Sequence, residues 1–290
     1  MVVDISMAPG AVPLAADEPK LLYHYTDPAG LYGIVENKNL RASDVWFMND
    51  AREAIYGLDT VEQALQPRNE PARDAEVRRR ALDWIKNVRM GEEFLRSYIA
   101  CLSADGDDLS QWRAYGRPRG FSIGFDTAQL RSLCSPSPKL NEPTLRYVMY
   151  DGRKQEELIS FQFNQAVYGL PVRPTDEQLQ AAAANFAYEV FVLAPAMKHH
   201  SFSSEQEARL HVYRQADDTG GLDFRPGAMG LVPFVPIDLR NPETGEMTLV
   251  REVIIGPQSN ERESQLSVKQ FFAHHGMGDV KVLLSKVPLR

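Results

Sequence analysis

Two polar segments, far apart along the chain, carry the residue types from which a binding or catalytic site can be built. In the first, Leu21–Asp27, a histidine stands between two tyrosines and is followed by a threonine. Side chains alternate along a strand, so His24 and Thr26 share one face and the two tyrosines share the other. Such a pair at a strand end can hold a hydroxyl or amide of a ligand, although a hydrogen-bonded core histidine explains the same pattern.

The second segment lies late in the chain and has the alternation of a strand. Four polar residues recur there at every second position, which predicts one strand face with about 7 Å between successive members: Glu205, Glu207, Arg209 and His211. Unpaired charge is costly to bury, so this face is either exposed to solvent or part of a site. Arg209 beside Glu207 favours the ionised carboxylate.

A short helix is predicted over Leu109–Gly116, where Trp112 and Tyr115 are three residues apart and therefore neighbours on one helical face. The two rings either pack in the core or form a flat wall against which a planar ligand binds. The following segment, Gly120–Gly124, matches the G-x-S-x-G pattern of serine hydrolases. That pattern requires a strand before the serine and a helix after it, whereas apolar residues alternate here, so Ser122 is predicted to be an ordinary strand residue.

Composition narrows the class of protein. The chain has 290 residues, 43% hydrophobic and 24% charged, which is typical of a globular protein with a proper core. A net charge of −7 argues against a protein that mainly coats nucleic acid. The two cysteines, Cys101 and Cys134, are too few for a disulfide framework or a zinc cluster. With no signal-peptide pattern and no apolar run long enough to span a membrane, the sequence predicts a cytoplasmic protein.

The predicted elements indicate an α+β fold with a mixed, mainly antiparallel sheet flanked by helices, because strands and helices intermix without regular βα alternation. We expect a disordered arm over 1–20 and a single domain over 21–290 with a helical insertion around 69–96. A helix beginning near Asn49 is predicted from the capping-box spacing of Asp50 and Glu53. Strands are expected at 21–26, 39–43, 97–103, 121–125, 145–151, 205–213, 222–224, 231–237, 252–256 and 280–285.

Taken in order, several blocks of the chain resemble a widespread bacterial domain of unknown function, from about Leu21 to the end. These blocks are His24-Tyr25-Thr26, Asn49-Asp50 with Glu53, Leu109–Tyr115 ahead of Gly120–Phe125, Lys198 with Ser201-Phe202-x-x-Glu205-x-Glu207-x-Arg209, and Ile254–Pro257. More distantly, a first strand with His-Tyr-Thr, a middle aromatic and a late Glu-x-Glu is similar to the ADP-ribosyltransferase superfamily, including the DarT-like enzymes that modify DNA.

That second resemblance implies an ADP-ribosyltransferase-like fold and a chemistry. In the superfamily the first-strand histidine holds a ribose hydroxyl of NAD, the aromatic packs against nicotinamide, and the late glutamate grips the nicotinamide ribose. Carried to this chain, His24 orients the dinucleotide and Glu207 is catalytic, with Glu205 as the other candidate. The implied NAD-binding residues are His24, Tyr25, Thr26, Ser43, Trp112, Tyr115 and Arg209.

NAD is therefore the expected substrate, and an unidentified protein or nucleic acid is the expected acceptor, as for a toxin, effector or phage-defence enzyme. Breaking the nicotinamide bond builds positive charge on the ribose, and a fixed carboxylate stabilises that charge without a metal.

Three other functions remain open from the sequence. Glu205 and Glu207, as same-face strand neighbours, match the carboxyl separation of an inverting glycosidase. A non-catalytic nucleotide-binding module keeps the same pocket without the reaction. A metal-dependent hydrolase or nuclease would bind its metal ion through histidine and glutamate side chains, which occur here at irregular spacing. These are His24, His199, His200, Glu205, Glu207 and His211.

Overall fold

The computed structural model of the chain describes residues 18–48, 51–89, 95–116, 119–227, 230–257 and 260–288, without the side chains of 51–54 and 89. Most of the predicted N-terminal arm, residues 1–17, lies outside the described residues. The side chains of the predicted capping box, Asp50 and Glu53, lie outside them too.

Within the described residues, ten strands form one sheet: β1 (Leu21–Thr26), β2 (Asn39–Asp44), β3 (Leu95–Ser103), β4 (Phe121–Asp126), β5 (Thr144–Tyr147), β6 (Glu207–Gln215), β7 (Asp223–Gly227), β8 (Gly230–Asp238), β9 (Val250–Ile255) and β10 (Lys281–Leu284). The helices are α1 (Pro28–Asn37), α2 (Ala51–Ala64), α3 (Ala72–Arg89), α4 (Leu109–Gln111), α5 (Thr127–Ser132), α6 (Gly152–Val167), α7 (Asp176–Leu193) and α8 (Glu261–His274). Short helical turns are η1 (Val45–Phe47), η2 (Trp112–Gly116), η3 (Ala194–Ala196) and η4 (His200–Glu205).

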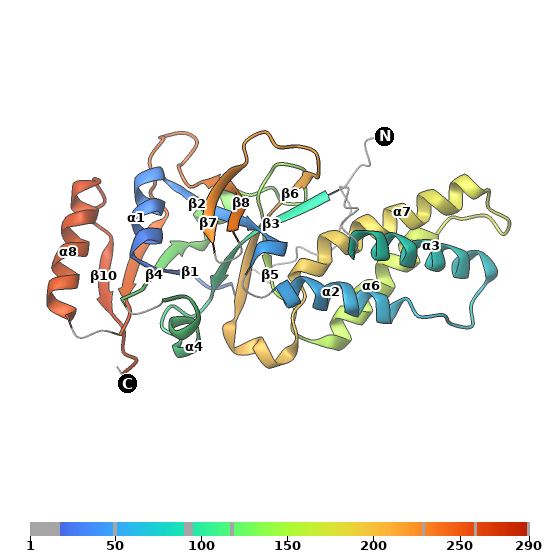
Figure 1. Cartoon of the computed structure of the whole chain (residues 1–290), viewed down its shortest axis with the longest axis horizontal. Helices are drawn as coiled ribbons and strands as arrows, with labels where there is room; N and C mark the ends of the chain where they lie inside the picture. Colours follow the sequence, from blue (N-terminus) through green and yellow to red (C-terminus); the bar gives the residue numbers. More distant parts are fainter. Residues whose placement is uncertain are drawn as a thin grey trace.

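The strand order is β10-β9-β4-β1-β3-β2-β8-β7, with β6 pairing to both β3 and β5. Only β9 and β10 run parallel, and the remaining ladders of the described residues are antiparallel. This confirms the predicted α+β class and its mixed, mainly antiparallel sheet. Helices flank the sheet at both ends, with α1 and α8 at one end and α2, α3, α6 and α7 at the other (Figure 1).

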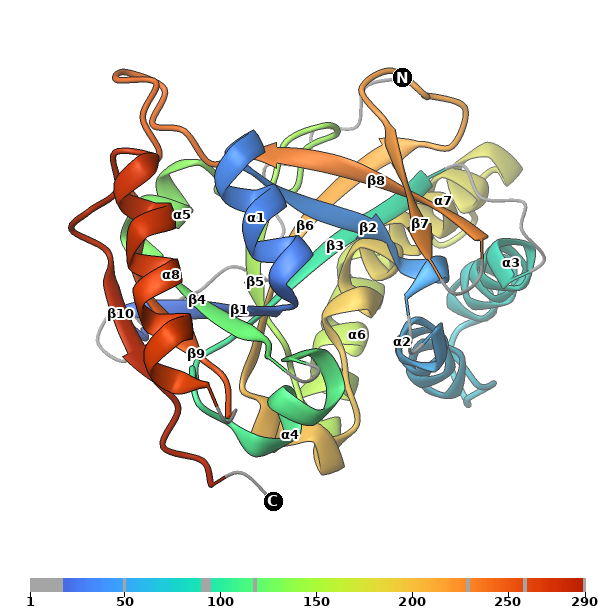
Figure 2. The same ribbon diagram turned by 60° about the vertical axis from the view of Figure 1, so that its left-hand side comes forward.

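The sheet divides at β3. The whole length of β3, from Leu95 to Ser103, pairs with β6 along one edge. On the other edge β1 pairs at Ser103, whereas β2 pairs at Ile99 and Tyr98. The two strands therefore diverge, as Figure 2 shows, and the backbone from Ala100 to Leu102 lies between them. Backbone polar groups at such a gap need other partners, which makes it a natural place for side chains or a ligand.

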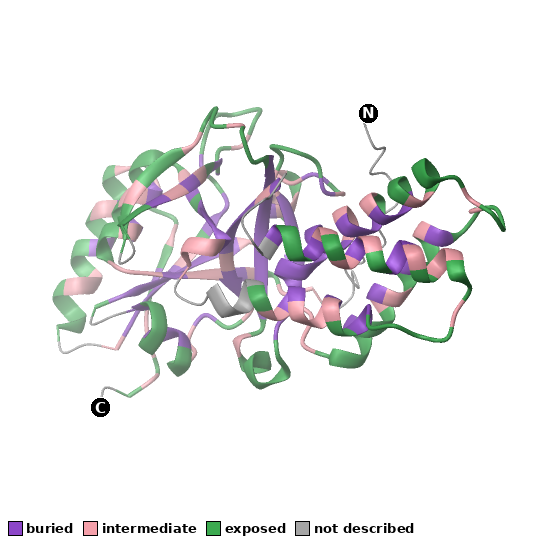
Figure 3. Cartoon of the chain, turned by 45° about the vertical axis from the view of Figure 1, so that its right-hand side comes forward, coloured by how far each residue is buried: buried purple, intermediate pink, exposed green. Residues whose placement is uncertain are grey.

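The two largest hydrophobic cores of the described residues support the two ends of the molecule. One core joins a face of the sheet to α1, α5 and α8, and the other fills the space among α2, α3, α6 and α7. The buried colour in Figure 3 follows the central strands and the inner faces of these helices. The predicted insertion around 69–96 contains α3, whereas Leu95 and Arg96 already belong to β3.

Local signals explain the turn that follows β1. Asp27 caps α1 by accepting the Gly30 N–H at 2.8 Å, and Pro28 occupies the first helical position, where its missing N–H costs nothing. Ser122 lies within β4, opposite Tyr25 of β1 and Ile254 of β9. It is the ordinary strand residue that the alternation predicts, and it does not form a hydrolase elbow.

Candidate functional site

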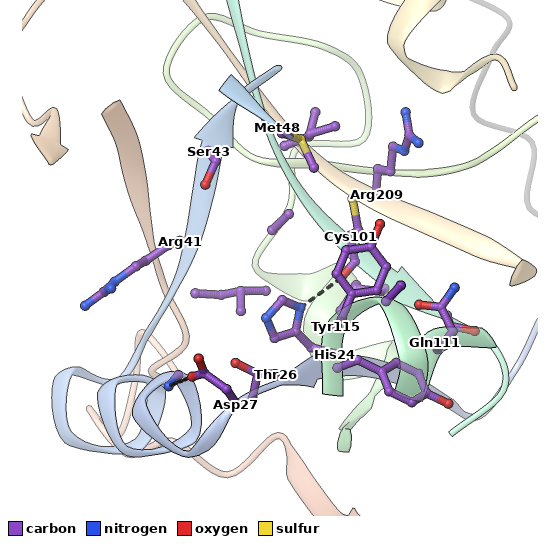
Figure 4. A pocket seen from close by; sticks show the side chains of 18 of the residues that line it. His24, Thr26, Asp27, Arg41, Ser43, Met48, Cys101, Gln111, Tyr115 and Arg209 are labelled. Carbon is purple, nitrogen blue, oxygen red and sulfur yellow. Dashed lines mark hydrogen bonds between the residues drawn. The ribbon is translucent and has the colours of Figure 1, made fainter. Parts of the chain in front are cut away.

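A cavity of about 590 Å³ opens where β1 and β2 diverge. Its walls come from β1 and the start of α1 on one side and from β2 and β7 on the other. The middle of β3, the α4–η2 segment and the start of β6 complete the lining. Figure 4 shows His24 and Tyr115 near the middle of this group, with Arg41 and Arg209 on opposite sides of it. The volume falls within the range of roughly 300–1,000 Å³ common for small-molecule pockets.

His24 presents one ring nitrogen to this cavity and uses the other to hold the sheet. Its Nδ1 lies 2.9 Å from the carbonyl oxygen of Cys101, in the gap between β1 and β2 (Figure 4). A carbonyl oxygen only accepts, so Nδ1 carries the proton and Nε2 of the neutral ring is an acceptor. Burial lowers the pKa of His24, against the opposing effect of the Cys101 hydrogen bond, so the ring is neutral at pH 7. The site thus offers an acceptor suited to a ligand hydroxyl.

Thr26 lines the cavity beside His24, and the start of α1 packs closely against its side chain. A Cβ atom placed on Gly30 would lie 1.8 Å from Thr26 Oγ1. Glycine at position 30 therefore lets the first turn of α1 approach the end of β1, and any larger residue would displace the Thr26 hydroxyl.

Four charged side chains form a compact cluster at the β6 side of the cavity. Both Glu207 oxygens accept hydrogen bonds from Arg209, from Nε and from Nη2, at 2.8 Å each. Lys198 Nζ donates to Glu207 Oε2 at 3.3 Å and to Glu205 Oε2 at 2.5 Å. Arg209 is itself anchored by donating from Nη1 to the Pro195 carbonyl oxygen at 2.5 Å. Two carboxylates and two cations balance, which is the condition for burying such a cluster.

Glu207 is held as a carboxylate. Its burial opposes ionisation, but the charge and hydrogen bonds of Arg209, together with Lys198 and a hydrogen bond from Cys101, outweigh that effect and lower the pKa of Glu207 to about 2. The Glu207 side chain is 7% exposed and that of Glu205 is 19% exposed. Glu207 is thus the fixed member of the pair, and Glu205 is the more accessible one.

The structure differs from the predicted strand face in two respects. Glu205 ends η4, and Gln206 adopts a left-handed conformation with φ of 44° before β6 begins at Glu207. Glu205 therefore reaches the cluster from a turn. His211 shares the face of Glu207 and Arg209 but is fully buried away from the cavity, where its Nδ1 lies 3.2 Å from the Tyr213 hydroxyl.

The two candidate aromatic residues lie in different environments. Tyr115 is 39% exposed and lines the cavity, whereas Trp112 is 5% exposed and does not. Trp112 instead packs edge-on against Tyr25, with ring centroids 4.8 Å apart, and donates from Nε1 to Asp107 at 2.9 Å. They differ because Trp112–Gly116 is a π-helical turn, whose wider winding removes the i, i+3 neighbour relation expected of an α-helix.

Tyr25 lines the cavity but its hydroxyl is engaged elsewhere: it donates to the Asp105 carbonyl oxygen at 2.8 Å and accepts the Asp108 N–H at 2.9 Å. Ser43 also lines the cavity, as the resemblance implied, and its Oγ accepts a hydrogen bond from Arg225 at 3.2 Å. Lining residues that the sequence analysis did not single out include Arg41 and Arg225. The alternation of Arg41 with Ser43 on one strand was the available signal for Arg41.

Two of the alternative functions, the metal-dependent enzyme and the glycosidase, find less support in this geometry. Among the described side chains, no three or more His, Cys, Asp or Glu residues come together as metal ligands. His199 and His200 lie in and beside η4, with ring centroids 4.2 Å apart. A glycosidase needs one protonated carboxylic acid, whereas the pKa of Glu207 is lowered and Glu205 accepts a hydrogen bond from the Lys198 cation.

Comparisons with known proteins give one partial family match and no activity. Neither the curated proteins nor the solved structures contain a match to this chain. In the part of the chain that the structure describes, no helix is both long and apolar enough to cross a membrane. Residues 111–210, which supply Tyr115 and the Glu205–Glu207–Arg209 side of the cavity, match the model of a family described as "Protein of unknown function (DUF2971)". This match, over about a third of the chain, agrees with the expected resemblance to a domain of unknown function.

Proposed function

We propose that the cavity binds NAD and that the protein transfers ADP-ribose from it to a macromolecular acceptor, as a toxin, effector or defence enzyme would. The observation that carries the proposal is that a single cavity brings together His24, Tyr115 and Glu207, which come from β1, η2 and β6. These are a neutral imidazole acceptor, an accessible aromatic ring and an ionised carboxylate. Each suits one part of a nicotinamide riboside: a ribose hydroxyl, the planar base and the sugar on which charge develops.

The proposed reaction breaks the bond between C1′ of the ribose and the nicotinamide nitrogen. Nicotinamide leaves with the bonding electron pair, which neutralises its pyridinium ring, and positive charge develops on the sugar. Glu207 is suited to stabilise that charge because it is ionised and its orientation is fixed by Arg209, so it need not reorganise during the reaction. A nucleophilic atom of the acceptor then bonds to C1′, and its proton passes to Glu205, the more accessible carboxylate.

The test is incubation with NAD labelled in its adenylate phosphate and a panel of protein, DNA and RNA acceptors, with nicotinamide release measured in parallel. Binding is checked first as thermal stabilisation by NAD. We expect Glu207→Gln to lower nicotinamide release about 10²-fold or more, the usual effect of removing a group that stabilises developing charge. His24→Ala should weaken NAD binding about tenfold, as for the loss of one hydrogen bond in a buried site.

Glu157→Gln serves as the matched control because it removes an exposed carboxylate from α6. It should leave both readouts unchanged. The proposal fails if the wild-type protein neither gains thermal stability with NAD nor releases nicotinamide with any acceptor.

A second function has one observation in its favour. Both Glu207 oxygens are engaged by cations, so the carboxylate is already neutralised before a ligand enters. A cavity of this kind can bind a nucleotide without turning it over. NAD-dependent stabilisation that persists in Glu207→Gln, with no nicotinamide release by either protein, would favour this non-catalytic binding module.

A further inference from the structure

The β2 and β7 side of the cavity carries two guanidinium groups that the proposed reaction does not use. Arg41 lies on β2 and Arg225 on β7, and both line the cavity. Arg225 is half-buried and donates from Nη2 to Ser43 Oγ at 3.2 Å. The Arg41 guanidinium lies 5.0 Å from the centre of the Phe234 ring. Neutral groups thus hold both cations in place.

Strand register places the two arginines on either side of Ser43, because Arg41 pairs with Pro236 of β8 and Arg225 pairs with Val232. Ser43 of β2 pairs with Phe234 of β8, and Phe234 pairs in turn with Asp223 of β7. Arg225, two residues further along β7, extends across β8 to reach Ser43. Arg41 precedes Ser43 by two residues on β2 and so projects from the same strand face. The β7–β8 hairpin therefore adds a second arginine to the cavity wall that carries the arginine of β2.

Neither guanidinium forms an ion pair with a carboxylate of the described residues. Arg209, in contrast, is bound by Glu207 at the other wall of the same cavity. Burial lowers the pKa of Arg225, and the like charge of Arg41 lowers it further. The nearby carboxylate that lines the cavity from α1, Asp27, is engaged in capping the Gly30 N–H. Two like charges held together are stabilised by a bound anion.

We propose that Arg41 and Arg225 form an anion subsite that binds the diphosphate of a nucleotide ligand. This inference rests on the proposed function and specifies its substrate class as a diphosphate ester. A guanidinium group matches phosphate geometry with two parallel donors, and two such groups facing one cavity suit a pair of linked phosphates better than a single carboxylate. Arg225 is half-buried and Arg41 is exposed at the rim, and both line a cavity that also holds His24 and Glu207, which favours a small molecule over a nucleic-acid backbone.

The subsite is tested by calorimetry with inorganic pyrophosphate and with ADP-ribose, neither of which contains the bond that the proposed reaction breaks. We expect Arg225→Gln and Arg41→Gln each to weaken binding of both probes about tenfold or more, the effect of losing one charge-assisted interaction. Adenosine, which lacks phosphate, should bind wild type and variants alike. Arg79→Gln is the matched control, because Arg79 is exposed on α3 and paired with Glu76 and Asp83.

Ser43→Ala keeps both charges but removes the acceptor that holds Arg225, so it should weaken binding several-fold and less than Arg225→Gln. The subsite is refuted if wild type binds neither probe, or if both arginine variants bind pyrophosphate as well as wild type does. Tighter binding of single-stranded DNA than of ADP-ribose would overturn the assignment to a small molecule. If both probes bind in an arginine-dependent way while no nicotinamide is ever released, the subsite stands and the proposed transferase activity falls.

Discussion

The ionised state of Glu207 makes a quantitative prediction for the Glu207→Gln variant, which keeps the shape of the side chain and removes its charge. In the folded protein the pKa of Glu207 is about 2, against an ordinary value of 4.5. At about 1.4 kcal/mol per pKa unit, the difference corresponds to about 3 kcal/mol of folding free energy. This is the magnitude expected when one partner of a buried ion pair is removed and leaves the other uncompensated.

The sign of the pH dependence follows from the direction of the shift. A carboxyl group with a lowered pKa in the folded state stabilises the fold above its unfolded pKa, and that stabilisation is lost as the pH falls toward the folded pKa. We therefore expect Glu207→Gln to be less stable than wild type by about 3 kcal/mol at pH 7 and by only about 1 kcal/mol at pH 3.

The measurement is urea unfolding of both proteins at pH 7, 5, 4 and 3, with Glu157→Gln as the exposed-carboxylate control. The control should follow wild type within about 0.5 kcal/mol at every pH. A Glu207→Gln variant that is destabilised equally at pH 7 and pH 3, or by less than about 1 kcal/mol at pH 7, would show that Arg209 and Lys198 do not hold Glu207 ionised as described.

Three further predictions concern the residues around the cavity. Gly30→Ala should destabilise the protein by about 1–3 kcal/mol, because its Cβ would overlap Thr26 Oγ1, whereas alanine in a helix ordinarily stabilises; equal or greater resistance to urea would contradict that contact. Trp112→Ala should lower the free energy of unfolding by about 3–5 kcal/mol, because it truncates a core side chain. Tyr115→Ala should lower it by less than about 1 kcal/mol and should weaken NAD binding. Equal losses in urea unfolding would contradict the different burial of the two side chains. Burial lowers the pKa of His211 well below its ordinary 6.5, so wild type loses stability as the pH falls below 6.5. His211→Gln should reduce the slope of the free energy of unfolding against pH by about 1.4 kcal/mol per pH unit. An unchanged slope between pH 6 and 5 would show that His211 is charged in the folded protein.

Short-range patterns in the sequence determined the elements and part of the site. The β1 alternation, the Asp27-Pro28 helix start and the alternating strand through Ser122 were all predictable, because caps, proline and period-2 hydrophobicity act within a few residues. The same local chemistry indicated that His24 and Glu207 were polar residues in need of partners.

Only the tertiary structure decided which of these residues meet. The divergence of β1 and β2 along β3 creates the cavity, and it depends on pairings between strands more than fifty residues apart, which no local pattern specifies. The left-handed Gln206 moved Glu205 out of the strand, and the π-helical turn separated Tyr115 from Trp112, because both depend on backbone geometry that residue types alone leave open. Arg225 reached Ser43 through the register of β7, β8 and β2, so the basic wall of the cavity exists only in the folded sheet.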